Sequence, residues 1–192
     1  MLKNLANRMH KDQKGITGLE TAIILIAFVV VAAVFAYTVL SAGIFTTQKA
    51  QEAVYTGLEE VEATLQIKGS VIATSNDTGA NGTVDDITFT VEGAMQGLAI
   101  NFTEPPDNVV VISYLDSTQV ERDIDWSVAK VGDADDDYLL EGDEKFELTV
   151  DLSALSLGPD TTFSVEVKPP TGAVLVIERT TPAWIDAVMD LH

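Results

Sequence analysis

Five carboxylates between residues 133 and 144 have the spacing of a calcium-binding loop. They are Asp133, Asp135, Asp137, Glu141 and Glu144. Counted from the first, they fall at positions 1, 3, 5, 9 and 12, and carboxylate oxygens are ligands that Ca²⁺ prefers. Position 6 is Tyr138, where an EF-hand loop needs glycine, and no helices are expected on either side. The stretch is therefore not an EF-hand. A Ca²⁺ site in a loop between strands and a solvated acidic turn are the two interpretations that remain.

Residue types that support catalysis are scarce. The two histidines are His10, within an N-terminal basic segment, and His192, and the chain has no cysteine. A Ser-His-Asp arrangement, a histidine metal centre and a thiolate metal site therefore lack their residues. No glycine spacing matches a phosphate-binding loop or a dinucleotide-binding fingerprint. The sequence indicates a protein that is not an enzyme and that requires no cofactor.

Three tripeptides have the form of N-glycosylation acceptors. They begin at Asn76, Asn81 and Asn101. Such a sequon carries an N-linked glycan only where the protein is exported and the asparagine is accessible. Asn76 and Asn81 lie in a segment rich in glycine, serine and asparagine that is typical of a loop, whereas Asn101 lies near the end of a predicted strand.

The residues after 65 have the pattern of β-strands. Short runs rich in Val, Ile, Thr and Phe are separated by Gly, Pro, Asn and Asp. The predicted strands are Ile67 to Thr74, Thr83 to Val91, Met95 to Phe102, Asn108 to Leu115, Gln119 to Ala129, Lys145 to Asp151, Thr162 to Val167 and Ala173 to Glu178. This number of short strands predicts an all-β sandwich of immunoglobulin-like or Greek-key type over residues 66–192, with Trp126 in its core.

One long helix is predicted ahead of the strands, over residues 16–65. The segment from Ala22 to Phe45 is strongly apolar and has no charged side chain. It is long enough to cross a bilayer as a helix. After it, an apolar stripe that includes Val54, Leu58, Val61 and Leu65 recurs at helical spacing among polar residues. We expect the stripe to lie against the β domain of the same chain. The predicted fold class is therefore α+β, a long hydrophobic helix followed by a β-sandwich.

A basic leader precedes the apolar run. It contains Lys3, Arg8, Lys11 and Lys14 and ends at Gly15. A conventional secretory signal is cut after its apolar region. A cut after Gly15 would instead remove only residues 1–15 and leave the helix on the mature protein. The alternative is a single-pass anchor that keeps the leader as its cytoplasmic flank.

The junction and the segment that follows it resemble a known family. Three parts of it are similar to those of archaellins, the filament subunits of the archaeal flagellum. They are Lys14-Gly15, the opening Ile16-Thr17-Gly18-Leu19-Glu20-Thr21-Ala22 and the continuation from Val29 to Gly43. The resemblance is specific over roughly the first 60 residues. It implies a class III signal peptide, like that of type IV pilins, which a prepilin-type leader peptidase removes between Gly15 and Ile16.

The resemblance also implies an assembly route. The precursor would be inserted in the membrane, and the helix would then polymerise with identical or related archaellins into an extracellular filament that the archaellum motor rotates for swimming. Glu20 would neutralise the amino terminus at Ile16 of a neighbouring subunit, while its alternative place is the membrane interface near the headgroups. Archaellins are often N-glycosylated, which would make the chain a glycoprotein.

The charge of the chain excludes one class of partner. Without the 4 basic and 1 acidic residues of the leader, 7 basic and 29 acidic residues remain, a net charge of −22. Such a surface repels phosphate backbones, so no nucleic-acid binding is expected. Three alternatives to the archaellin stay open, namely an adhesion pilin, a membrane-anchored surface binding module and a hydrolase, for which no set of catalytic residues is found.

Overall fold

The structure, a computed structural model, describes residues 2–95 and 97–191, with side chains described from Gly18 onward. It divides into two compact units, Met1–Val54 and Tyr55–His192, and each is considered by itself. The first unit is entirely helical where it is described. The second contains the last turns of the same helix and all the strands.

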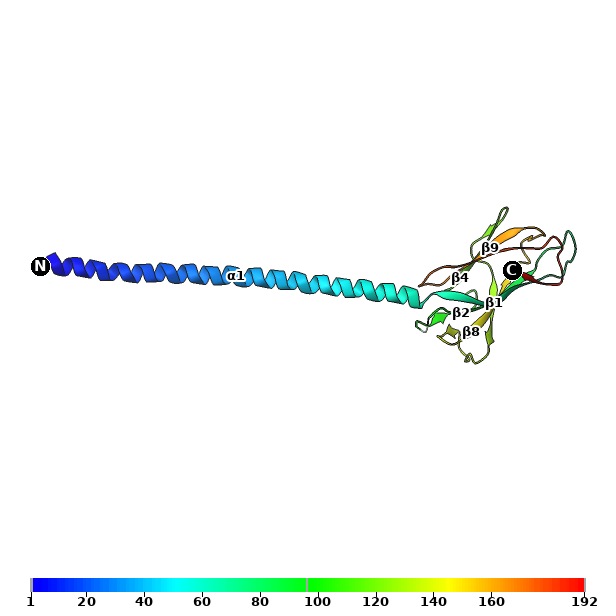
Figure 1. The fold of residues 1–192 in the computed structure, drawn as a ribbon, viewed down its shortest axis with the longest axis horizontal. Helices are drawn as coiled ribbons and strands as arrows, with labels where there is room; N and C mark the ends of the chain where they lie inside the picture. Colours follow the sequence, from blue (N-terminus) through cyan, green and yellow to red (C-terminus); the bar gives the residue numbers. More distant parts are fainter. Residues whose placement is uncertain (1, 96, 192) are drawn as a thin grey trace. The chain divides into compact units, whose positions relative to one another are not determined.

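The helix α1 comprises Leu2–Glu62 without interruption (Figure 1). The prediction of a helix over 16–65 was wrong at both ends, since the helical backbone includes the predicted leader and Leu65 belongs to the first strand. The leader is helical because it is rich in Leu, Ala, Lys, Arg and Met, and because the first proline of the chain is Pro105. Gly15 and Gly18 each cost only about 1 kcal/mol in a helix and do not end it.

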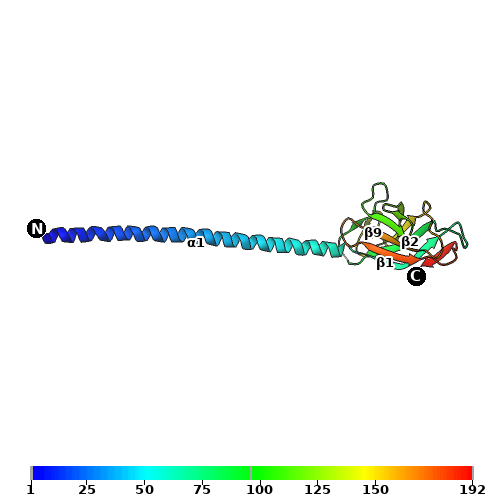
Figure 2. The same ribbon diagram turned by 90° about the horizontal axis from the view of Figure 1, so that it is seen from above.

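The strands form two main antiparallel sheets (Figures 1 and 2). The five-stranded sheet has the order β11-β1-β2-β8-β6, with bounds Val188–Leu191, Leu65–Thr74, Asp86–Gly93, Lys145–Asp151 and Trp126–Val131. The four-stranded sheet has the order β10-β9-β4-β5, with bounds Leu175–Thr180, Thr162–Lys168, Val111–Asp116 and Val120–Glu121. A further pair joins β3 (Ile100–Asn101) to β7 (Leu139–Leu140). The predicted α+β class is confirmed.

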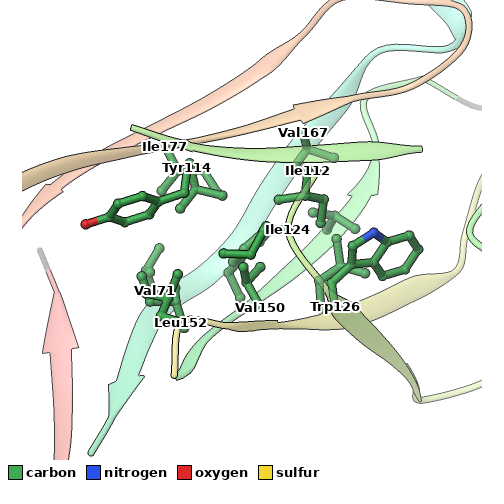
Figure 3. Packing of buried hydrophobic residues seen from close by; sticks show 14 of the residues in the cluster. Val71, Ile112, Tyr114, Ile124, Trp126, Val150, Leu152, Val167 and Ile177 are labelled. Atoms are coloured by element: carbon green, nitrogen blue, oxygen red, sulfur yellow. The ribbon is translucent and has the colours of Figure 1, made fainter. Parts of the chain in front are cut away.

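One hydrophobic core lies between the two sheets (Figure 3). Val71 and Val150 of the five-stranded sheet face Ile112 and Val167 of the four-stranded sheet, because alternate residues of each strand point to the same side. Ile124 lies between the layers and is 7% exposed. From Gly18 onward, the first residue of the chain that contributes to this core is Ala63, which directly follows the helix.

An aromatic cluster packs in one part of the core. Phe102 makes edge-to-face contacts with Trp126 at a centroid distance of 6.0 Å and with Phe146 at 5.8 Å. Trp126 is 5% exposed, which confirms the predicted core position. Tyr114 and Phe163 stack at 6.0 Å elsewhere in the core. Aromatic pairs of this geometry add about 0.5–1.5 kcal/mol beyond the area that they bury.

The turn from β4 to β5 is held by Asp116. Its carboxylate accepts hydrogen bonds from the Tyr114 hydroxyl at 2.8 Å, from the Thr118 amide at 2.5 Å and from the Gln119 amide at 2.8 Å. Burial alone would raise the pKa of Asp116, but these hydrogen bonds outweigh it and lower the pKa to about 2. Burial, together with the neighbouring carboxylate, raises the pKa of Tyr114. The carboxylate thus stays ionised where the fold needs an acceptor.

Three differences from the predicted strands have local causes. Gln119 to Ala129 is two strands, β5 and β6, because the chain crosses from one sheet to the other at Ile124, whose amide donates to the Ile112 carbonyl. Met95 to Phe102 contains only the two-residue β3 in its described part. Strands β7 and β11 were missed because they are short, and β11 has only two inward residues.

The predicted cover of the helical stripe by the same chain was wrong. Leu58 and Val61 are 46% and 52% exposed, while Ala63 and Leu65, which follow the helix, are buried. The chain enters the core at this point beside Gly172, which has a φ of 102° and approaches the Ala63 carbonyl too closely for a Cβ atom. The last helical turns therefore keep an uncovered apolar stripe.

Candidate assembly surface and modification sites

The largest apolar surface of the chain is its helix. Every residue from Gly18 to Val61 is exposed, including Phe28 at 71%, Phe35 at 68% and Tyr37 at 73%. The segment Gly18–Glu62 is long and apolar enough to cross a membrane. A soluble monomer rarely exposes a contiguous apolar patch above a few hundred Å². This helix requires either a bilayer or other copies around it.

Three threonine hydroxyls on the helix are compatible with burial. Thr38 donates to the Phe35 carbonyl at 2.8 Å, Thr46 to the Ala42 carbonyl at 2.8 Å, and Thr47 to the Gly43 carbonyl at 2.9 Å. Polar groups in an apolar environment are costly unless they are hydrogen-bonded. Because these bonds lie within the helix, no partner has to supply a polar group at those positions.

The predicted junction residues lie within α1. Lys14, Gly15 and Ile16 have helical backbone, and their side chains lie outside the described part of the structure. Glu20 is exposed on the same helix. Residues four apart share one face of a helix, so Ile16 and Glu20 are on one side of α1, one turn apart. The side of the helix that carries this pair continues into the uncharged segment.

The acidic residues of 133–144 are used by their own loop. The Glu144 carboxylate accepts from the Asp135 amide at 2.9 Å and from the Glu141 amide at 3.1 Å. Asp135 accepts from the Asp137 amide, and Asp137 from the Leu139 amide. Among the described residues, no group of three His, Cys, Asp or Glu side chains is placed to hold a metal ion. These bonds favour the solvated acidic turn.

The three sequons differ in their surroundings. Asn81 is exposed in the segment between β1 and β2, and Asn76 is also exposed, with its side-chain amide donating to Asp85 at 2.8 Å. Asn101 is half-buried in β3, and its side-chain oxygen accepts from the Thr103 amide and hydroxyl at 2.8 and 2.7 Å. Attachment of a glycan at Asn76 would cost the bond to Asp85, whereas at Asn81 no such hydrogen bond is found within the described residues.

The sequence analysis missed a groove on the outer side of the four-stranded sheet. Its residues come from β4, β5, β9 and the turn after β5. The signal was present in the run Val109-Val110-Val111-Ile112, because continuous apolar residues are typical of a strand covered on both faces. Val110 and Ile112 are fully buried, whereas Val111, which lines the groove, is only partly covered.

Comparisons with known proteins agree with the geometry. The model of the archaeal-type flagellin family matches residues 15–179. The chain is 40% identical to "Probable flagellin 1" of Archaeoglobus fulgidus, over 96% of this chain and 98% of that relative. It is 34% identical to "Probable flagellin 2" of the same archaeon, over 92% of this chain and 94% of that relative.

Two solved structures share the fold. A chain of the archaeal flagellum of Methanospirillum hungatei strain JF1 matches with a TM-score of 0.67 and 27% identity, over 91% of this chain and 98% of that one. Archaeal flagellin FlaB1 from Methanocaldococcus jannaschii matches with a TM-score of 0.56 and 14% identity, over 67% and 96%. With the family model and full-length relatives in agreement, the chain belongs to the archaeal-type flagellin family.

Proposed function

We propose that the chain is inserted in the membrane by α1, loses residues 1–15 to a prepilin-type peptidase and then polymerises through the helix. The chain is a structural subunit of the archaellum filament, and its relatives are flagellins rather than enzymes or adhesion pilins. The observation that carries the assembly route is the helix from Gly18 to Val61, which is exposed on every side and uncharged from Ala22 to Phe45.

Burial of the helix among identical helices would hold the filament together. Each apolar Å² withdrawn from water is worth roughly 25 cal/mol. Contacts between identical subunits that repeat without closing into a ring produce a helical polymer. The internal hydrogen bonds of Thr38, Thr46 and Thr47 support this, because these three hydroxyl groups stay satisfied when the helix leaves water.

Glu20 would act during assembly. Removal of residues 1–15 leaves a positively charged amine at Ile16, and an apolar filament interior makes an unpaired charge costly. The Glu20 carboxylate of one subunit would neutralise the Ile16 amine of its neighbour. The start of the family match at residue 15, beside the proposed cleavage point, supports the processing step.

The β domain would form the outer surface of the filament. With a net charge of −22 in the mature chain, this surface stays hydrated at the cell exterior. Asn76 and Asn81 are the proposed glycan acceptors, because both are exposed, whereas Asn101 is half-buried. The carboxylates of Glu144, Asp135 and Asp137 accept hydrogen bonds from backbone amides of the loop, which supports the solvated acidic turn over a calcium site.

N-terminal mass spectrometry of filaments sheared from cells that make the chain tests the proposal. The expected mature protein begins at Ile16, and a Gly15→Val variant should accumulate unprocessed in the membrane without filaments or swimming. Gly18→Val is the matched control for processing alone, because a side chain at Gly18 meets open space in the single chain, and it should still yield a protein that begins at Ile16. Filaments whose subunits retain residues 1–15 would overturn the processing step. Protein found only in the membrane would favour the anchored binding module.

A further inference from the structure

The outer side of the four-stranded sheet carries an apolar groove. It has a volume of ≈ 370 Å³, and β4 forms its floor between β5 and β9. The apolar lining residues are Val111, Leu115 and Val120, of which Leu115 is 44% and Val120 is 59% exposed. Val176 extends this surface across β9, since it lies opposite Glu166 and is 54% exposed. The groove is thus part of a larger aliphatic face.

The corresponding face of the five-stranded sheet has a different chemistry. Its outward positions on β2 and β8 are threonines and charged residues, such as the cross-strand pair Thr88 and Thr149, whose hydroxyls lie 3.2 Å apart. Asp86 lies opposite Asp151 in the same ladder, and burial together with this neighbouring charge raises the pKa of Asp86. The outward positions of β2 and β8 therefore suit water, and the exposed Val188 lies on β11 at the edge of that sheet. On the four-stranded sheet, aliphatic side chains are uncovered on the inner strand β4 as well.

Charge distinguishes the groove further. Lys168 binds Glu166 at 2.7 Å and the Ser113 hydroxyl at 3.1 Å, so this pair is satisfied within the chain. Arg122 also lines the groove, and within the described residues its guanidinium has no ion pair or hydrogen bond. The mature chain has only 7 basic residues. An unpaired arginine beside exposed aliphatic residues fits a partner that is both apolar and acidic.

We propose that the groove receives the acidic segment 133–139 of a neighbouring copy in the filament. That segment carries Asp133 and Asp135–Asp137, together with Tyr138 and Leu139, which are 43% and 37% exposed. Tyr138 and Leu139 would cover Val120 and Leu115, and the carboxylates would pair with Arg122. This inference rests on the proposed function, since the polymerised helices bring the β domains of different copies close together.

The contact joins two different surfaces, so it propagates from copy to copy without closing. Such a head-to-tail contact is compatible with a helical polymer and requires no symmetry of its own. Because the apolar part is small, we expect it to add to the helix contacts rather than to hold the filament alone.

Cysteine cross-linking tests the contact directly, because the chain has no native cysteine. A Val120→Cys/Tyr138→Cys double variant, oxidised within sheared filaments, should give a ladder of covalent multimers on denaturing gels. The matched control is Thr88→Cys/Tyr138→Cys, in which the first cysteine is on the threonine-rich face and no ladder is expected.

Two cross-linking outcomes overturn the proposal. Intact filaments of the double variant without a ladder would refute the contact while leaving the filament function in place. Dimers from Val120→Cys alone would show that grooves face each other and would exclude the acidic segment as the occupant. Absence of filaments from the unmodified chain would instead contradict the proposed function.

A charge exchange provides the second measurement, which does not depend on the cysteine variants. Arg122→Glu should lower the temperature at which sheared filaments release subunits, and Arg122→Glu/Asp137→Lys should recover most of that loss. Equal release temperatures for Arg122→Glu and the unmodified chain would overturn the proposal. So would a loss in Arg122→Glu that the second substitution leaves unchanged, because the partner charge would then lie elsewhere.

Discussion

Replacing Phe35 by alanine should weaken the filament and leave the fold of the β domain unchanged. Phe35 lies on the uncharged part of α1 and is 68% exposed in the single chain, so its ring stabilises nothing within the β domain. Any free energy that it contributes must come from contacts with other copies. The substitution therefore separates polymer stability from domain stability.

The magnitude follows from the area that neighbours can cover. A fully buried aromatic side chain removes about 150–250 Å² from water, so an exposed fraction of 68% leaves roughly 100–170 Å² available at Phe35. Alanine retains part of this area, and the difference is about 100 Å², worth about 2.5 kcal/mol per subunit at ~25 cal/mol per Å². A loss of that size raises the equilibrium concentration of free subunits roughly 60-fold.

Sedimentation of sheared filaments measures this concentration, and urea unfolding of the detergent-solubilised protein measures the β domain. We expect a large rise in free subunits for Phe35→Ala with an unchanged urea midpoint. Phe89→Ala is the converse control, because Phe89 is 1% exposed in the core. Its loss should lower the free energy of unfolding by about 3–5 kcal/mol, and with it the urea midpoint. An unchanged free-subunit concentration in Phe35→Ala would refute helix burial as the source of cohesion.

Three further substitutions test the β domain by urea unfolding. Phe102→Ala should cost about 3–5 kcal/mol, because it removes a fully buried ring with two aromatic contacts, and a loss under 1 kcal/mol would contradict the packing. The pKa of Asp116 is lowered to about 2, so its contribution is present above pH 4 and is lost as the pH falls through about 2. Asp116→Asn should cost about 1 kcal/mol at neutral pH, allowing for solvent exposure, and should flatten that acid limb. The pKa of Asp86 is raised by burial and by Asp151, so the stabilising effect of its protonated form is lost as the pH rises, and Asp86→Asn should stabilise the domain at neutral pH. A lower urea midpoint in Asp86→Asn would contradict that sign.

The sequence predicted the helix and most of the long strands because each has a strong periodic signal. Ala22 to Phe45 is uniformly apolar, and strands such as β8 and β9 alternate buried and half-buried residues along their length. The helix begins earlier than predicted, because a site of proteolytic processing such as the expected cleavage after Gly15 does not change the helix propensity of the residues around it. A processing site and a structural boundary are separate properties.

The missed features depend on contacts between distant segments. Strand β11 is recognised only by its pairing with β1, as in Val71 with Leu191. The crossing between sheets at Ile124 interrupts a run that is β-like at both ends. The acidic loop likewise shows that spacing along the sequence does not determine the partners of a side chain. The spacing suited a metal ion, but in the structure the carboxylates of Asp135 and Asp137 accept hydrogen bonds from neighbouring backbone amides.

The helix and the β domain have separate roles because they bury their apolar area in different places. Within the described chain, the core begins at Ala63 and draws on both sheets, so the β domain requires nothing from residues 18–61 for its packing. From Gly18 to Val61, in turn, every residue of the helix is exposed, and the stability of this segment outside a bilayer depends on neighbours. Substitutions on the sheet surfaces can therefore change contacts between copies, charge or glycan attachment without altering the helix that polymerises. The uncovered aliphatic side of the four-stranded sheet is where we propose that the β domain departs from this independence, because a neighbour there would make the outer surface contribute to filament stability.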